Sequence, residues 1–418
     1  MRISRELLAH ATAALTTLLA FSRPADEVLS HYFRGHPMLG QQDRAFVAEA
    51  SFAVLRRLRS LEAAAGSREP RPLLIGALIR VLGFSGRALE GVLEAGEEVL
   101  VARIKAARAD EPPGAVRADL PDWLWQRLTE EYGEAAALRI AHGLLNPAPL
   151  DLRANLARTS RAAVLEALKA DGFEGAATPY SPAGIRLTGK PAINRHPLFA
   201  NGLLEVQDEG SQLLSWLLAP RRGEMVADYC AGAGGKTLAI AMLMRGSGRV
   251  YAMDVSTKRL AALAPRAARA GITNVHTIAL SGDHDARVKR LAGKLDRVLV
   301  DAPCSGFGTL RRNPDLKWRH AQGAIDELAQ KQSRILESAA TLVKPGGRLV
   351  YATCSILRAE NEAVAQEFLA KHPQFSALSC TELLAAQRIP LDAGAQLRLW
   401  PHLHGTDGFF AAAFERVA

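Results

Sequence analysis

Two cysteines stand where apolar runs of the chain give way to polar residues, and an aspartate accompanies one of them. One run ends in Asp301-Ala-Pro-Cys304-Ser, and the next apolar run ends in Ala-Thr-Cys354-Ser. If these runs are neighbouring strands of a parallel sheet, their carboxyl ends meet at one crevice and the three side chains converge there. A single buried cysteine is usually a small apolar filler. Two cysteines at adjacent strand ends favour a chemical role.

Thiols at such a place suit addition to a pyrimidine ring. Carbon 5 of a pyrimidine is not nucleophilic, but a thiolate that adds to carbon 6 turns carbon 5 into an enamine-like carbon that can attack a methyl sulfonium. A base then removes the proton from carbon 5, and the thiol leaves. A free cysteine, with a pKa of about 8.5, is only partly ionised at neutral pH, so a cation such as Lys236 would favour the thiolate. We expect Asp301 to hold the amidine edge of a cytosine.

A glycine-rich turn follows an earlier apolar run, in the sequence Asp228-Tyr-Cys-Ala-Gly-Ala-Gly-Gly-Lys-Thr237. Small residues let a ligand approach the backbone amides, which predicts a nucleotide or nucleoside site. A phosphate-binding P-loop would need glycine at position 230, where cysteine stands, so ATPase and GTPase activities are disfavoured. Asp254 ends the next strand about 20 residues later, where a carboxylate reaches ribose hydroxyls. These features fit a dinucleotide or S-adenosylmethionine, and an ordinary glycine-rich turn is the plainer alternative.

A cationic segment separates the two cysteine motifs. Its sequence is Leu310-Arg-Arg-Asn-Pro-Asp-Leu-Lys-Trp-Arg319. Basic side chains contact phosphates and an aromatic ring can stack on a base, which predicts an RNA-binding segment with four cations and one ring: Arg311, Arg312, Lys317, Arg319 and Trp318. Trp318 has an equally good alternative role, because a tryptophan can simply anchor the segment to the protein.

The elements that must position these residues fall into three regions. Residues 1–145 carry helical periodicity with Pro and Gly punctuation and no strand-like alternation, which predicts an all-helical domain. The first 21 residues resemble a weak secretory signal, but their apolar residues recur at helical spacing, and we interpret them as the first helix. Residues 146–222 mix strand and helix signals and predict a small α+β module. Residues 223–418 alternate apolar strands with helices, which predicts a doubly wound, Rossmann-like α/β domain with a largely parallel sheet.

Composition narrows the class of protein further. Apolar residues make up 48% and charged residues 23% of the 418 residues, as in ordinary globular chains. The formal charge is +9, and the excess lies downstream of residue 145, which is compatible with a nucleic-acid groove and also with a merely basic protein. Four cysteines without a C-x-x-C pair support neither a disulfide framework nor a zinc site. No apolar stretch is long enough to span a bilayer. We expect a cytoplasmic monomer without a metal.

Three sequences together, DYCAGAGGKT, DAPCSGFGTLRRNPDLKW and YATCSILRAEN, resemble the NOP/Sun family of RNA cytosine-C5 methyltransferases, most nearly its bacterial RsmB-like branch that acts on 16S ribosomal RNA. The resemblance extends upstream, where ADEVLSHYFRGHPMLGQQDRAFVAEASFAVLRR is similar to a helical NusB-like RNA-binding domain and the middle module to an RRM-like domain. It implies that Cys354 is the nucleophile and that Cys304 helps to release the product.

The resemblance also implies where S-adenosylmethionine would bind. The implied contacts are Cys230, Ala231, Gly232, Ala233, Gly234, Gly235 and Lys236, with Asp254, Asp283 and Asp301. One departure stands out, because Gly232-Ala233 replaces the usual Ala-Pro of the family. The loss of a proline frees the loop, which could weaken cofactor affinity but removes no reacting group.

Two functions remain as alternatives at this stage. The first is methylation of cytosine C5 in small-subunit ribosomal RNA, with transfer RNA as the runner-up substrate. The second is a noncatalytic RNA-binding assembly or antitermination factor, in which the helical domain acts and the sheet domain is a relic. The presence of Cys304, Cys354, Asp301 and Lys236 favours the enzyme.

Overall fold

The computed structural model describes residues 3–107, 112–282 and 285–417, and the chain forms two compact units. The first unit, here the helical unit, comprises Met1–Pro147 and Thr309–Gln322. The second comprises Ala148–Gly308 and Gly323–Ala418, and it is here called the catalytic unit because it contains the cysteines for which the sequence predicts a chemical role. The helical unit is therefore discontinuous in sequence, which the division into three successive regions did not anticipate.

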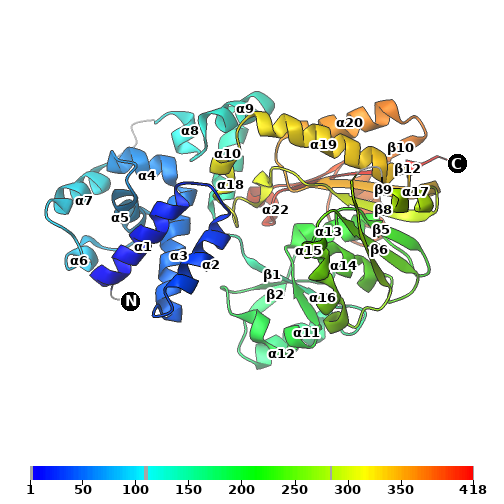
Figure 1. The fold of residues 1–418 in the computed structure, drawn as a ribbon, viewed down its shortest axis with the longest axis horizontal. Coiled ribbons are helices and arrows are strands. Elements are labelled where there is room, and N and C mark those ends of the chain that lie inside the picture. The colour runs from blue at the N-terminus through cyan, green and yellow to red at the C-terminus, as the bar shows by residue number, and fades with distance from the viewer. Residues whose placement is uncertain (1–2, 108–111, 283–284, 418) are drawn as a thin grey trace. The chain divides into compact units, whose positions relative to one another are not determined.

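The helical unit is built, among the described residues, from helices of the N-terminal region and one helix of the later segment (Figure 1). Their bounds are α1 Arg5–Leu18, α2 Ala25–Gly35, α3 Gln41–Arg56, α4 Leu58–Ala65, α5 Pro70–Arg80, α6 Gly86–Leu89, α7 Glu97–Ala106, α8 Gly114–Arg117, α9 Asp122–Tyr132, α10 Glu134–Leu145 and α18 Leu316–Arg319.

Helix α1 shows how the sequence dictates these helices. Ser4 caps its N-terminus by accepting a hydrogen bond from Leu7 N, and the apolar residues at helical spacing, Leu7, Leu8, Ala11, Ala14, Leu15 and Leu18, are all buried. The first helix forms as predicted. Helix α4 ends at Ala65 and is capped by Gly66, whose positive φ of 64° suits glycine.

The catalytic unit begins with a small antiparallel sheet of order β2-β3-β1-β4. Its elements are β1 Leu150–Ala154, α11 Arg161–Ala170, β2 Gly175–Ala177, β3 Gly184–Leu187, the 3-10 turn η1 Ile193–Arg195, α12 Pro197–Ala200 and β4 Leu204–Val206. Val164 and Leu168 of α11 pack with Leu152 and Ile185 of the sheet to form a separate small core. The predicted α+β character of this region is confirmed.

The large sheet has the strand order β10-β12-β9-β8-β5-β6-β7, with β11 paired to β12. Its strands are β5 Met225–Asp228, β6 Arg249–Asp254, β7 Val275–Ala279, β8 Leu295–Asp301, β9 Val343–Thr353, β10 Phe375–Leu378, β11 Leu397–Leu399 and β12 Phe409–Arg416. Strands β5 to β9 pair in parallel, whereas β10, β11 and β12 pair antiparallel. The predicted Rossmann-like sheet is confirmed, with an antiparallel edge that the sequence patterns did not indicate.

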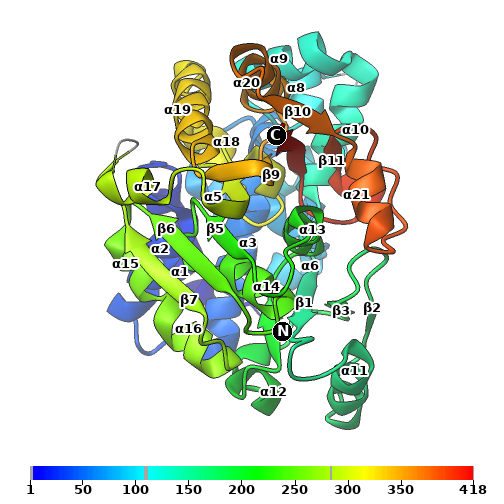
Figure 2. The same cartoon turned by 90° about the vertical axis from the view of Figure 1, so that its right-hand side faces the viewer.

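Helices cover both faces of this sheet. They are α13 Glu209–Leu218, α14 Gly235–Leu243, α15 Thr257–Ala261, α16 Leu263–Ala270, α17 Ala286–Leu291, α19 Gly323–Ala340, α20 Glu362–Lys371, α21 Cys380–Ala386 and α22 Pro401–His404, with 3-10 turns η2 Phe307–Thr309 and η3 Arg358–Glu360. In Figures 1 and 2, α19 and α20 lie above the sheet and α14 and α16 below it.

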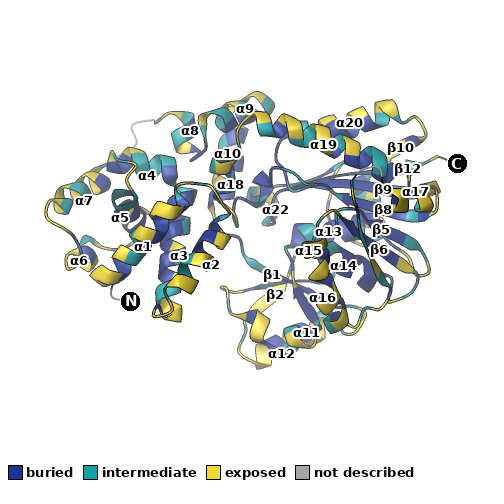
Figure 3. Ribbon diagram, in the orientation of Figure 1, coloured by how far each residue is buried: buried dark blue, intermediate teal, exposed yellow. Residues whose placement is uncertain are grey.

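The two faces of the sheet have separate cores because successive strand residues point in opposite directions. On β8, Val298 and Val300 pack with α19 and α20, whereas Leu299 packs with α13 and α14. The central strands are accordingly almost wholly buried (Figure 3). Each such side chain contributes roughly 1.5–3 kcal/mol on burial.

The strand order reverses beside β5, which has β6 on one side and β8 on the other. In open parallel sheets, ligands bind outside the carboxyl ends of the strands at such a reversal. The glycine-rich turn after β5, Asp254 at the end of β6 and Asp301 at the end of β8 all stand at this edge.

Candidate active site

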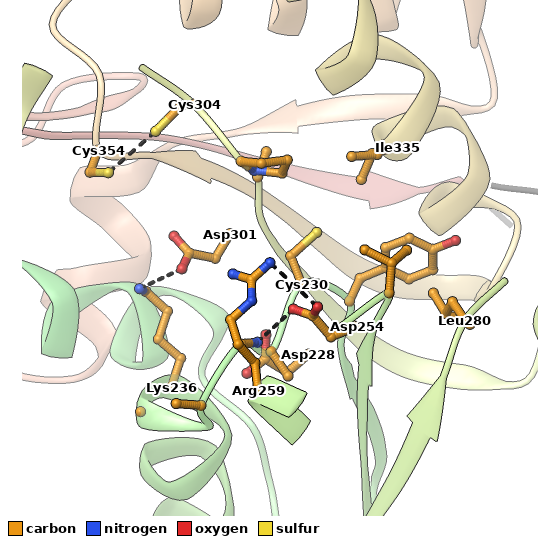
Figure 4. Close-up of a pocket in the computed structure, with 18 of the residues that line it drawn as sticks. Asp228, Cys230, Lys236, Asp254, Arg259, Leu280, Asp301, Cys304, Ile335 and Cys354 are labelled. Atoms are coloured by element: carbon orange, nitrogen blue, oxygen red, sulfur yellow. Dashed lines mark hydrogen bonds and ion pairs between the residues drawn. The ribbon is translucent and has the colours of Figure 1, made fainter. Parts of the chain in front are cut away.

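A cavity of about 460 Å³ opens at this edge of the catalytic unit. That volume is typical of a pocket for a small molecule or cofactor. Figure 4 shows Cys304 and Cys354 at one end and Leu280 and Ile335 at the other, with the charged residues between them. The pocket is therefore elongated, with thiols at one end and apolar side chains at the other.

The structure brings the two thiols together. The Sγ atoms of Cys304 and Cys354 lie 3.2 Å apart. Strands β8 and β9 pair in parallel with Asp301 opposite Ala352, so the residues after each strand leave the sheet side by side. Gly308 N donates a hydrogen bond to the carbonyl oxygen of Cys354 at 2.8 Å. A Cβ atom at position 308 would lie only 2.7 Å from that oxygen, so the close approach of the two loops requires glycine there.

Lys236 and Asp301 form an ion pair beside the thiols, with 2.6 Å between Nζ and Oδ2 (Figure 4). Burial by itself would lower the pKa of Lys236, but the charge of Asp301 and the hydrogen bond to it outweigh burial and raise that pKa. The negative charge of a Cys354 thiolate is among the weaker contributions in the same direction. Lys236 is thus held as a cation, and its role in favouring a thiolate stays a prediction.

The other two thiols of the pocket are held protonated. The hydrogen bond to Cys354 and then burial raise the pKa of Cys304 well above its ordinary value. Burial, followed by the charge of Asp301, raises the pKa of Cys230 well above its ordinary value. Both side chains therefore carry a proton at neutral pH.

The glycine-rich turn wraps around the middle of the pocket. Residues Cys230, Ala231, Gly232, Ala233, Gly235 and Lys236 line it. Gly234 does not line the pocket; its φ is 86°, and a Cβ atom there would collide with the side chain of Leu263, so glycine is required. Asp254 accepts hydrogen bonds from Gly232 N at 2.8 Å and from Ser256 N at 2.7 Å.

Two guanidinium groups hold the carbonyls of this turn. Arg266 donates to the oxygen of Ala233 at 2.6 Å, and Arg153 of β1 donates to the oxygen of Gly235 at 2.9 Å. Glu205 of β4 accepts from Arg266 at 2.9 Å and so ties that guanidinium to the small sheet. The turn lacks a proline at position 233, and these bonds restrict its backbone in another way.

Asp228 is a pocket residue that the sequence reasoning did not select. Its Oδ2 accepts a hydrogen bond from Thr237 at 2.7 Å, while its buried Oδ1 has no hydrogen-bond partner among the described residues. Burial raises the pKa of Asp228 to about 7. A buried carboxylate oxygen without a donor fits a ligand that brings one, such as an ammonium group. Its place at the carboxyl end of β5 is the signal that could have identified it.

The cationic segment lies in the helical unit, where several of its side chains pack. Lys317 is 2% exposed, and its Nζ donates to the carbonyl oxygens of Arg56 at 2.9 Å and Asp119 at 2.7 Å. Trp318 Nε1 donates to Leu55 O at 2.9 Å, and its ring packs on the apolar core of the unit. The anchoring alternative therefore describes Trp318 in this structure, and Lys317 is not accessible to a phosphate.

The remaining cations of the segment differ in exposure. Arg311 is 7% exposed and its carbonyl accepts a hydrogen bond from Arg56, whereas Arg312 is half-buried and Arg319 is exposed beside Asp315. Contacts with RNA phosphates stay a prediction for Arg312 and Arg319.

Three further expectations concern ligands and membranes. Asp283 lies outside the described residues. Within residues 3–107, 112–282 and 285–417, no group of three or more His, Cys, Asp or Glu side chains could hold a metal ion. No helix in the described part of the chain has the length and apolar character needed to cross a membrane.

A doubly wound sheet with a ligand pocket at its strand ends is the fold of Rossmann-like methyltransferases. The structure of a methyltransferase homologue from Pyrococcus horikoshii is similar to this one, with a TM-score of 0.62 and 32% sequence identity. The match covers 73% of this chain and 98% of that one. A family model described as 16S rRNA methyltransferase RsmB/F matches residues 215–415. A second model, described as the ferredoxin-like domain of the same group, matches residues 120–194. The chain belongs to the RsmB/F family.

Relatives in bacteria agree with this assignment. The probable ribosomal RNA small subunit methyltransferase B of Bacillus subtilis is 35% identical over 309 residues, which cover 72% of this chain and 67% of the relative. The corresponding protein of Synechocystis is 38% identical over 300 residues, covering 71% of this chain and 67% of the relative.

Proposed function

We propose that this protein methylates carbon 5 of a cytosine in small-subunit ribosomal RNA, with S-adenosylmethionine as methyl donor and a covalent cysteine adduct as intermediate. The observation that carries the proposal is the 3.2 Å separation of the Cys304 and Cys354 sulfur atoms, next to the Lys236–Asp301 ion pair. Thiols, with a cation and a carboxylate beside them in a cofactor-sized pocket, are the groups that thiol addition to a pyrimidine needs.

The pocket fits the proposed cofactor along its length. Asp228, with its unpartnered oxygen, would receive the ammonium group of the methionine moiety. Asp254 stands where ribose hydroxyls are bound in such folds. Leu280 and Ile335 at the far end would contact the adenine ring. When bound, S-adenosylmethionine supplies an electrophilic methyl group.

Each side chain at the thiol end of the pocket then has its own role in the reaction. The Cys354 thiolate, stabilised by the positive charge of Lys236, adds to carbon 6 of the cytosine and makes carbon 5 nucleophilic. Asp301 accepts a hydrogen bond from the exocyclic amino group of the base. After methylation a base removes the proton from carbon 5, the carbon–sulfur bond breaks, and the Cys354 thiolate is released. The assignment of attack to Cys354 and of assistance in release to Cys304 rests on the family resemblance.

The choice of ribosomal RNA as substrate rests on relatives such as those of Erwinia tasmaniensis and Klebsiella pneumoniae, which are named ribosomal RNA small subunit methyltransferase B. The proposed phosphate contacts are Arg312 and Arg319. A transfer RNA substrate and a noncatalytic RNA-binding role are the alternatives that experiment must distinguish.

The proposal is tested by bisulfite sequencing of RNA from the source organism with and without the gene. We expect one or more 5-methylcytosines of small-subunit ribosomal RNA to disappear in the deletion strain and to return with the wild-type gene but not with the Cys354→Ala gene. Loss of 5-methylcytosine from transfer RNA alone would move the substrate to that class. An unchanged methylation pattern in all RNA would refute the enzymatic proposal.

Calorimetry tests the cofactor separately. The purified protein should bind S-adenosylmethionine or S-adenosylhomocysteine without added metal, and Asp254→Ala should weaken this binding. Tight binding of NAD or ATP, with none of either adenosyl compound, would overturn the cofactor assignment.

A further inference from the structure

Glu360 is a buried carboxylate that the mechanism above does not use. It ends the turn η3, which follows β9 in the catalytic unit, and its side chain has no exposed surface. Its Oε1 accepts hydrogen bonds from Ser305 N at 2.8 Å and from Gln332 Nε2 at 3.0 Å. Its Oε2 accepts from Ser305 Oγ at 2.6 Å and from Ser355 Oγ. Four donors from three segments thus converge on one carboxylate, which suits the acceptor-only ionised form.

The two serines that bind Glu360 are the residues that follow the two cysteines. Ser305 follows Cys304, and Ser355 follows Cys354. The hydroxyl oxygens of the serines lie 3.2 Å apart, as do the sulfur atoms of the cysteines. The carboxylate therefore joins the two cysteine loops directly behind the pair of thiols.

We propose that Glu360 is a positioning residue that clamps the Pro-Cys-Ser loop to the Thr-Cys-Ser loop and so keeps the two thiols in contact at the pocket. The inference deepens the proposed function, on which its catalytic meaning rests. The clamp acts through Ser305 and Ser355, because Glu360 itself does not line the pocket.

Neighbouring bonds fix the clamp in turn. Gln332 of α19 donates from the same amide nitrogen to Pro303 O at 2.9 Å, and so reaches the Pro-Cys-Ser loop a second time. Tyr351 OH donates to Glu360 O and to Gln332 Oε1 at 3.1 Å. Asn361 Nδ2 donates to Ser355 O at 3.1 Å and holds the other loop. Buried polar networks whose members are all hydrogen-bonded make the structure around them rigid.

The clamp also makes the two thiols electrostatically unequal. The negative charge of Glu360 is one of the groups that raise the pKa of Cys304, after its hydrogen bond to Cys354, burial and the charge of Cys354. Lys236, by contrast, is positively charged and interacts electrostatically with Cys354. Other titratable groups near Cys304 are Tyr351 and, lining the same pocket, Lys331, Lys236, Asp301 and Cys230. Glu360 therefore opposes a thiolate at Cys304.

The first test replaces the charge while keeping the size. The rate at which iodoacetamide alkylates Cys304 is measured as a function of pH by peptide mass spectrometry. In Glu360→Gln this pH profile should shift to lower pH by about one unit, because a like charge has been removed. Cys230 is an internal control, since Glu360 is not among the groups that act on its pKa. Glu362→Gln, two residues away on α20, is the matched charge control and should leave both profiles unchanged.

The outcomes separate positioning from general loosening. A shift confined to Cys304 supports the proposal, whereas an equal shift of Cys230 and Cys304 shows that the variant merely opens the pocket and overturns it. An unchanged Cys304 profile in a folded Glu360→Gln protein also overturns it. Alkylation does not depend on RNA, so this result stands even if the protein proves to have a different substrate.

A second pair of variants keeps the proposal testable if Glu360→Gln does not fold. Ser305→Ala and Ser355→Ala each remove one hydroxyl donor to the carboxylate and leave the cysteines intact. We expect kcat for RNA methylation to fall about 10- to 100-fold in each, with KM for S-adenosylmethionine within about twofold of wild type, because misplacement of a reacting group affects the chemical step. Wild-type kcat in both variants would refute the clamp.

Discussion

The carboxyl group of Asp228 connects the electrostatics of the pocket to a measurable stability. Burial raises its pKa to about 7 from an ordinary value of 3.8, against the opposing effect of the hydrogen bond from Thr237. Between about pH 4 and pH 7 the folded protein keeps a proton that the unfolded chain has released. The resulting contribution to the free energy of unfolding is present at low pH and is lost as the pH rises through 7.

The size of this contribution follows from the two pKa values. One pKa unit corresponds to about 1.4 kcal/mol, and at pH 5 the contribution is about 2.7 kcal/mol, whereas at pH 8 it is close to zero. The free energy of unfolding of the catalytic unit should therefore fall by about 2–3 kcal/mol between pH 5 and pH 8 through this group alone.

The assay is urea unfolding at pH 5 and pH 8, compared between wild type and Asp228→Asn. Asparagine keeps the size of the side chain and an oxygen that can accept from Thr237, but it cannot titrate. The difference between the two pH dependences should be about 2–3 kcal/mol. Asp26→Asn, at an exposed position of α2, is the control and should behave as wild type. If Asp228→Asn keeps the full pH dependence of wild type, Asp228 is ionised in the folded protein and the reasoning is refuted.

Three further predictions concern the thiols, the helical unit and RNA. Cys354→Ala should abolish methyl transfer and covalent RNA adducts, whereas Cys304→Ala should accumulate an adduct that survives denaturing gels; the reverse pattern would exchange their roles. Burial lowers the pKa of Lys317 to about 7, so the free energy of unfolding should rise with pH above 7, and Lys317→Met should remove this rise in urea unfolding. Arg312→Glu and Arg319→Glu should weaken RNA binding in fluorescence anisotropy and flatten its salt dependence by about 0.7–0.9 per lost phosphate contact. Unchanged affinity and slope would contradict the last prediction.

Local sequence patterns predicted those helices and strands whose own residues show a clear helical spacing or a short apolar run. The run RVLVDAP at residues 297–303 predicted a strand covered on both faces, and α1 follows the spacing of its leucines. The antiparallel strand β12 was not predicted. Its core residues are apolar almost throughout, a pattern that periodicity alone cannot assign to strand or helix.

The site was predictable to the extent that residues sit at strand ends. Cys304, Cys354 and Asp301 meet because parallel strands bring their carboxyl ends to one edge. Glu360 escaped the sequence reasoning because its importance arises from hydrogen bonds to residues 55 positions away, as with Ser305. A single glutamate in a turn carries no local signal of such a partner.

The cationic segment shows the opposite kind of error. Its composition predicted RNA binding, but two of its residues have that composition because they pack within the protein. Lys317 and Trp318 have the composition of an RNA-binding loop, yet their hydrogen-bond partners are backbone oxygens 198 to 263 residues earlier in the chain. A buried lysine is rare and is not expected from sequence unless its acceptors are known. Only the tertiary structure supplies those acceptors.

The discontinuous helical unit has a consequence for the order in which the protein can fold during synthesis. Residues up to Pro147 leave the ribosome first, but the unit also contains Thr309–Gln322. At roughly 5–20 residues per second, the intervening stretch of about 160 residues takes on the order of 10 to 30 s to translate. During that interval the carbonyl oxygens of Arg56 and Asp119 lack the hydrogen-bond donor that Lys317 Nζ supplies in the finished protein. The N-terminal region therefore reaches its final packing only after most of the catalytic unit has been made.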